Sequence, residues 1–174
     1  MALPALAQDK LKVAVGQRGV WENSVSELGQ DAGIFKKHGL MLEVLYTQGG
    51  GETQQAVISG SVDIGIGVGT HGVMGAYSKG APVRILGATM RGYYEFWYVP
   101  SDSPIKTMKD ADGKTIAYST NGSSTQIMTI AFGKHFGVNL KPTATGSPPS
   151  TFTQAMSKQV DIGWTAPPLM LDAL

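Results

Sequence analysis

Short apolar runs rich in β-branched residues alternate along the chain with longer segments whose apolar residues recur at helical spacing. In the first half, the runs that predict strands cover residues 11–15, 42–46, 62–66 and 83–88, and the segments that predict helices cover residues 24–38, 53–59 and 72–79. Strands and helices in this order build a mostly parallel sheet with helices on both faces. The sequence therefore predicts an α/β fold, to which the aromatic stretch 93–99 adds a β-rich run.

The same alternation restarts after residues 100–104, where two prolines interrupt the chain. Strands are expected at residues 115–118, 140–144 and 160–164, helices at 124–135 and 152–158, and one more helix after Pro167-Pro168. We therefore predict two lobes joined by a hinge close to the proline segment. The first lobe is expected over residues 9–99, and the second, incomplete at its C-terminal end, over residues 100–174.

The second half also repeats motifs of the first. Gly39-Leu40-Met41-Leu42 corresponds to Gly137-Val138-Asn139-Leu140, and Val62-Asp63-Ile64-Gly65 corresponds to Val160-Asp161-Ile162-Gly163. Both pairs share one offset, since 137 − 39 and 160 − 62 each give 98. A shared offset between separate motifs indicates two similar α/β units. The alternative is that any two α/β units have a glycine between a helix and the next strand, whether or not they are related. The two aspartates lie just inside their strands, where we expect them to position the backbone.

Composition restricts the partners that the chain is expected to have. The formal net charge is +1 without a long charged run, so neither nucleic acid nor an anionic membrane surface is expected. The 174 residues include no cysteine and no apolar run near the ~18 residues that span a bilayer. Ala5-Leu6-Ala7 matches the A-x-A pattern of signal-peptide cleavage, so residues 1–8 are expected to be a signal-peptide remnant of a secreted, periplasmic protein.

The candidate site lies in the loops that follow the predicted strands. Parallel α/β folds bind ligands beyond the carboxyl ends of their strands, where helix N-termini present unpaired N–H groups. Six such loops are small and polar, and they lie at equivalent places in the two units. Tight turns and helix caps would account for the glycines and hydroxyl residues of any single loop. The six loops together predict a ligand cleft. The candidate ligand-binding residues are Trp21, Asn23, Gly50, Gly51, Thr70, His71, Asn121, Gly122, Ser123, Ser124, Thr125 and Trp164. The aromatics of residues 93–97 are assigned to core or hinge packing.

The sequence motifs give little support for an enzymatic function. Residues 67–72 satisfy G-x-G-x-x-G, but the following predicted strand ends without the acidic residue that would hold a ribose. No G-x-S-x-G elbow or phosphate-binding loop is present, and three histidines in unrelated places make neither a triad nor a metal site. We expect a non-enzyme without cofactor or metal.

Several of these motifs together resemble the periplasmic substrate-binding proteins of ABC transporters, in the group that binds sulfonate, nitrate and taurine and whose wider family includes binders of pyrimidine precursors. The similar segments are residues 33–40, 49–51, 59–65, 99–100, 103–108, 112–117 and 164–168. The resemblance implies a type II periplasmic-binding-protein fold, whose two α/β lobes close on ligand, and a missing C-terminal part. In sulfonate binders the ligand meets a helix start that falls on residues 122–125 here.

The resulting expectation is an extracytoplasmic solute-binding component of an ABC uptake transporter. It would bind a small, anionic organic solute of the sulfonate, nitrate or carboxylate type between its lobes and dock on the membrane permease. Two alternatives stay open, namely the effector-binding domain of a transcription regulator and a pyrimidine-precursor binding protein of the thiamine pathway. The cysteine cluster of the fungal pyrimidine-precursor synthases is absent, and a dimer of truncated chains that swaps elements is a further expectation.

Overall fold

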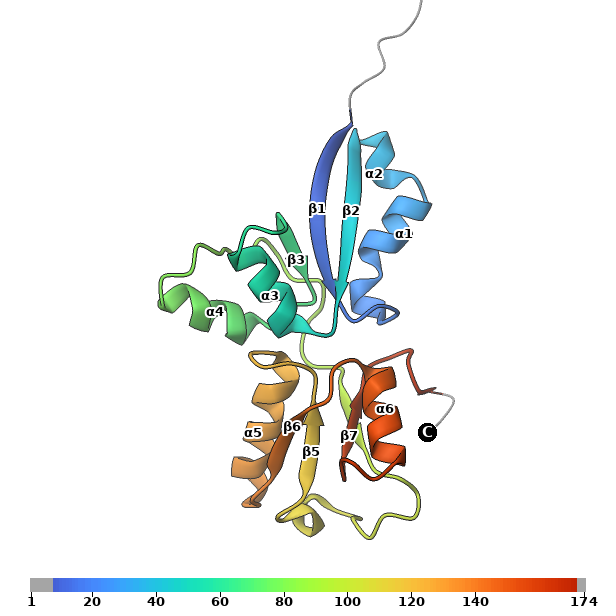
Figure 1. Ribbon diagram of the computed structural model, residues 1–174, viewed down its shortest axis with the longest axis vertical. Coiled ribbons are helices and arrows are strands. Elements are labelled where there is room, and N and C mark those ends of the chain that lie inside the picture. Colours follow the sequence, from blue (N-terminus) through green and yellow to red (C-terminus); the bar gives the residue numbers. More distant parts are fainter. Residues whose placement is uncertain (1–7, 172–174) are drawn as a thin grey trace, which may run out of the picture.

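Two α/β units lie end to end in the computed structural model, which describes residues 8–171 (Figure 1). The predicted signal-peptide remnant lies, but for Gln8, outside these residues. The first unit contains β1 (Asp9–Gly16), the short 3-10 helix η1 (Trp21–Asn23), α1 (Val25–Asp31), α2 (Ile34–Lys37), β2 (Leu40–Thr47), α3 (Gly50–Ile58), β3 (Ile64–Ile66) and α4 (Thr70–Ser78). The second contains β4 (Phe96–Tyr98), the 3-10 helix η2 (Met108–Ala111), β5 (Thr115–Tyr118), α5 (Ser124–Phe136), β6 (Lys141–Ala144), α6 (Pro148–Met156) and β7 (Gly163–Thr165).

The sheet of the first unit is parallel, with the strand order β2-β1-β3. Its core is formed by Val13, Val15 and Leu42, which are buried, with Phe35 of α2 packed against them. Helices α1 and α2 lie on one side of these strands, and α3 and α4 lie on the other (Figure 1). The predicted parallel sheet with helices on both faces is therefore confirmed for this unit.

The second unit repeats this arrangement and adds one antiparallel strand. β5 pairs in parallel with β6, and a parallel bridge between Ile116 and Ile162 connects β5 to the chain that enters β7. β4 pairs antiparallel with β7, with Trp97 opposite Trp164. Residues 96–98 are thus hydrogen-bonded to the second unit, although the sequence analysis assigned them to the first lobe.

Two side-chain clasps occur once in each unit, and their aspartate and threonine side chains share the 98-residue offset. Asp63 accepts a hydrogen bond from the backbone N–H of Lys12 (2.8 Å), and Asp161 accepts one from that of Thr115 (2.9 Å). At the opposite strand ends, the hydroxyls of Thr47 and Thr53 lie 2.6 Å apart, and those of Thr145 and Thr151 also lie 2.6 Å apart. Both aspartates position backbone, as expected, and the threonine pairs extend the repeat beyond the motifs found in the sequence.

Two predicted helices differ from the structure because of left-handed backbone. The helix expected over residues 24–38 is divided into α1 and α2 by Gly33, whose φ is 68°. The helix expected after Pro167-Pro168 is absent from the described residues, which form a turn with Met170 at φ 64°. Apolar periodicity does not register such a reversal of φ, which ends helical hydrogen bonding whatever the pattern of the side chains.

The predicted strand over residues 83–88 is also wrong, because this segment pairs with no strand within residues 8–171. It runs beside β3, but a cavity separates the two, so that no ladder of hydrogen bonds forms between them. Ile85 and Leu86 are consequently exposed, at 52% and 81%. A β-rich sequence becomes a strand only where a neighbouring backbone supplies donors and acceptors.

The Asp161 clasp predicts how the stability of the fold depends on pH. Hydrogen bonds from the Thr115 side chain and backbone, together with nearby Lys114, lower the pKa of the Asp161 carboxyl. Stabilisation by this carboxylate is therefore fully present above the ordinary aspartate pKa of about 3.9 and is lost as pH falls through the lowered folded value. We expect Asp161→Asn to destabilise the protein at neutral pH and to lose this difference in acid, as measured by urea unfolding at several pH values. Asp31→Asn, at an exposed position on α1, is the control; an equal effect of both variants would contradict the assignment.

Candidate functional site

The two units touch through glycine-rich loops at the ends of their strands. A Cβ atom on Gly51 would overlap the backbone carbonyl of Asn121, and one on Gly69 would lie 2.8 Å from the backbone nitrogen of Ser124. The backbone N–H of Gly51 donates a hydrogen bond to the hydroxyl of Thr120 (3.0 Å). Only residues without side chains permit this approach, so these glycines set how closely the units close.

An apolar contact closes the opposite end of the interface. Val20, which follows β1, is fully buried in a cluster with Trp164 and Ala166 of the second unit, and Leu169 packs against them. The backbone N–H of Trp21 donates to the carbonyl of Pro167 (3.1 Å). Contacts of both kinds, polar and apolar, therefore join the units.

Between these contacts lies a cavity of about 700 Å³ to which both units contribute. Its apolar walls come from β3 and the segment 83–90, with Ile64, Ile66 and Ile85 among the lining residues. Its other end is polar and reaches the second unit at Ser124. A volume of this size is in the range of small-molecule sites.

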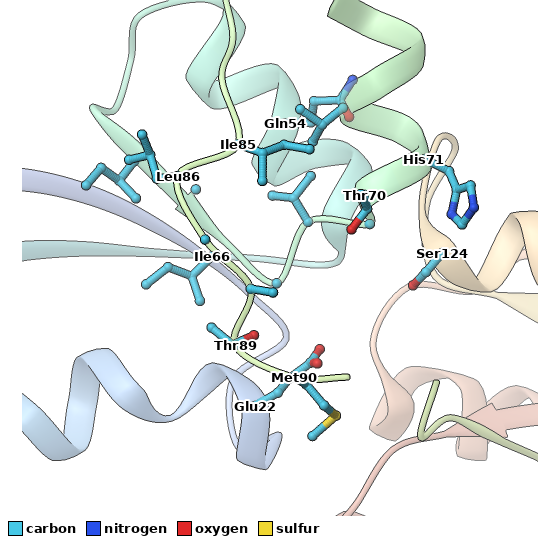
Figure 2. Close-up of a pocket in the computed structure, with 18 of the residues that line it drawn as sticks. Glu22, Gln54, Ile66, Thr70, His71, Ile85, Leu86, Thr89, Met90 and Ser124 are labelled. Carbon is cyan, nitrogen blue, oxygen red and sulfur yellow. The ribbon is translucent and has the colours of Figure 1, made fainter. Parts of the chain in front are cut away.

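Side chains from different elements converge on the polar end of the cavity. Figure 2 shows the carboxylate of Glu22 and the hydroxyls of Thr70 and Ser124 pointing toward the same space. Ser124 donates a hydrogen bond to the carboxylate of Glu95 (2.9 Å), which also lines the cavity. The imidazole of His71 lies at the side of this end, with its Nδ1 3.1 Å from the hydroxyl of Tyr93.

The electrostatics of this end are unfavourable for negative charge. Burial, and in addition the nearby carboxylate of Glu95, raise the pKa of Glu22, while a hydrogen bond with Tyr94 acts in the opposite direction. Burial, followed by the charge of Glu22, raises the pKa of the Tyr94 hydroxyl, so that it stays protonated and serves as a donor. Among the residues that the structure describes, no group of three or more His, Cys, Asp or Glu side chains is placed to hold a metal ion.

Of the predicted site residues, three line this cavity and two line a second hollow. Thr70, His71 and Ser124 belong to the cavity. Gly51 and Asn121 line the second hollow, of about 610 Å³, on the far side of the glycine contact. The structure thus brings residues of both units together at two places, one on each side of that contact.

The other predicted residues lie outside the cavity, and several of them contribute to packing or capping. Asn23 is only 3% exposed and donates to the backbone carbonyl of Gly16, and Trp164 is fully buried. Ser123 caps α5, and the hydroxyl of Thr125 accepts from the backbone N–H of Ser119 (2.9 Å). The three that remain do not line the cavity: Gly50 is buried beside Gly67, Gly122 faces Gly72, and Trp21 is 62% exposed.

Sequence reasoning missed Glu22, Gln54, Tyr94 and Glu95 as residues of the cavity. Glu22 lies between two predicted site residues, Trp21 and Asn23, so its position in a candidate loop was a signal that could have identified it. Tyr94 was assigned to packing together with Trp97, and both do pack against the apolar cluster that contains Val20 and Trp164. Tyr94 lines the cavity as well. Gln54 and Glu95 carry no motif, and only the three-dimensional arrangement brings them to the site.

Comparisons with known proteins agree on the type of protein. A family model described as NMT1/THI5 like matches residues 27–168. Curated proteins of Brucella abortus, Brucella suis and Brucella melitensis, each named as a candidate binding protein, are 29% identical over 164 residues, which cover 91% of this chain and 49% of theirs. The chain therefore spans about half the length of the curated relatives it matches.

Solved structures show the same fold. A protein of Bordetella bronchiseptica RB50 matches with a TM-score of 0.70 at 20% identity, covering 96% of this chain and 54% of that one. The alkanesulfonate-binding protein SsuA from Xanthomonas axonopodis pv. citri, bound to MOPS, matches with a TM-score of 0.69 at 22% identity, covering 99% and 59%. The fold is that of the type II periplasmic binding proteins, as predicted. In the part of the chain that the structure describes, every helix is too short or too polar to cross a bilayer.

The glycine contact predicts opposite effects of alanine at two positions. Gly51→Ala places a methyl group against the Asn121 carbonyl and should force the units apart, at a cost of about 1–3 kcal/mol in unfolding free energy. Gly75→Ala on α4 meets open space and should stabilise by about 0.5–1 kcal/mol through helix propensity. Denaturant unfolding measures the stabilities, and small-angle X-ray scattering measures the separation of the units. An unchanged radius of gyration and full stability in Gly51→Ala would contradict the contact.

Proposed function

Because the chain belongs to the NMT1/THI5-like family, we propose that it is the solute-binding part of an ABC-type uptake system and holds a small organic solute between its two units. The observation that carries this proposal is the cavity of about 700 Å³, which is lined from both units. A solute bound there contacts both units at once, so its binding free energy favours the closed arrangement.

The chemistry of the cavity suits capture rather than turnover. Its walls are largely apolar, and hydroxyl, carboxylate and imidazole groups gather at one end, where they can orient a solute. A binder needs no nucleophile–base pair, and the hydroxyl of Ser124 donates to a carboxylate instead of to a histidine. Proteins of similar fold are named for sulfonate binding in Xanthomonas and Escherichia coli, which supports the same type of role here.

Location and partner follow from this role as parts of the proposal. An uptake system receives its solute outside the cytoplasmic membrane, so the protein would be periplasmic and the closed form would dock on a membrane permease. The anionic solute expected from the helix N-termini stays a prediction, because the structure also places two carboxylates at the cavity. The curated relatives are longer than this chain, so the proposal includes further contacts to the solute from residues outside this chain.

The proposal predicts a solute-dependent rise in melting temperature that depends on the cavity. The screen should include alkanesulfonates, nitrate, carboxylates, aminopyrimidines and organic amines, with affinities then measured by titration calorimetry. Thr70→Val keeps the shape of the side chain but removes a hydroxyl that points into the cavity, and should weaken binding about three- to tenfold.

Thr153→Val, at an exposed threonine of α6 outside the cavity, should leave the affinity unchanged. The proposal fails if none of these solutes raises the melting temperature. It fails equally if the two threonine variants change the affinity to the same extent.

A further inference from the structure

The groups at the polar end of the cavity indicate which class of solute it accepts. This inference rests on the proposed function. We propose that the solute is an organic cation, whose protonated amine or amidine group is bound between the carboxylates of Glu22 and Glu95. The apolar part of the solute then lies along β3 and the segment 83–90.

The two carboxylates reach the cavity from different parts of the fold. Glu22 belongs to η1 of the first unit. Glu95 directly precedes β4 and is held by the hydroxyl of Ser124 at the start of α5 (2.9 Å) and by the backbone N–H of Tyr94 (3.3 Å). A cationic group between them therefore contacts both units and stabilises the closed arrangement.

The basic groups that line the cavity do not neutralise this pair. The guanidinium of Arg84 donates to the carbonyl of Val83 (2.8 Å) and lies over the ring of Tyr77, 4.8 Å from its centroid. The imidazole of His71 shares a hydrogen bond with Tyr93. The third carboxylate of the lining, that of Asp63, accepts from the backbone N–H of Lys12 (2.8 Å).

The carboxylates of Glu22 and Glu95 bring free acceptor positions to the polar end of the cavity. A carboxylate offers about four acceptor positions, and Tyr94 is the one described residue whose hydrogen bonding lowers the pKa of Glu22. The side-chain oxygen of Gln54, also part of the lining, is buried without a hydrogen-bond partner among the described residues. A solute rich in N–H donors can satisfy the free acceptor positions of Glu22, whereas an anion adds further acceptors.

The walls decide in favour of an organic cation over a metal ion. Ile64, Ile66 and Ile85 supply apolar surface along the cavity (Figure 2). A metal ion needs several converging ligands within about 2–2.6 Å, and no group of three candidate side chains converges in the described residues. Two half-buried carboxylates at one end of an apolar slot match a flat or extended amine.

Three probes of nearly equal shape test the sign of the charge: benzamidinium, neutral benzamide and benzoate. Benzamidinium should raise the melting temperature and bind at least tenfold more tightly than benzoate. Glu22→Gln and Glu95→Gln should each weaken benzamidinium binding about tenfold or more, since a hydrogen bond to a charged group is lost. Glu43→Gln, which makes the same change of charge at an exposed site on β2, should leave it unchanged.

A second measurement guards against variants that merely fold poorly. Removing either carboxylate relieves their repulsion, so the ligand-free melting temperature of Glu22→Gln and Glu95→Gln should equal or exceed that of the wild type. Tighter binding of benzoate than of benzamidinium, or benzamidinium binding that survives both glutamine variants, overturns the cation and leaves the solute-binding function intact. If none of the three probes and no solute of the wider screen raises the melting temperature, the proposed function is overturned as well.

Discussion

The close approach of the two units through glycine is the constraint on which the site depends. Where Gly51 meets Asn121 and Gly69 meets Ser124, backbone lies against backbone without intervening side chains. This contact fixes the distance between the units, and the distance in turn decides which side chains of one unit reach the other. The position of Ser124 at a cavity whose walls come from the first unit is a consequence of that spacing.

Much of the fold could be predicted because its signals are local. Apolar periodicity and helix-ending glycines such as Gly39 and Gly137 locate most strands and helices within a few residues, and the 98-residue repeat revealed two related units. The failures have a common cause. A strand at residues 83–88 needs a neighbour distant in sequence, and the breaks at Gly33 and Met170 depend on φ, which side-chain patterns do not encode.

The sequence predicted loops that meet between the units, and three of the predicted residues, Thr70, His71 and Ser124, line the cavity there. Strand-end loops do meet between the units, since parallel strands deliver their carboxyl ends to one edge. The sequence does not reveal how the loops are used. Glycines that resembled ligand cradles provide the contact, Ser123 caps α5, and Thr125 accepts from the backbone N–H of Ser119 in the loop after β5. Glu22 and Glu95 line the cavity because the fold brings them there, and their spacing in the sequence does not predict this position.

The repeat also explains why the cavity opens beside the outer edge of β3 in the first unit and not beside its counterpart in the second. In the second unit, the outer edge of β7 is covered by the antiparallel strand β4, and Trp97 fills the space beside it. In the first unit, β3 is the equivalent of β7, but within the described chain its outer edge faces the cavity. β4 covers the second edge because the chain crosses from one unit to the other just before Phe96. The same crossing carries Glu95 past the polar end of the cavity, so a single connection both closes one unit and supplies a carboxylate to the other.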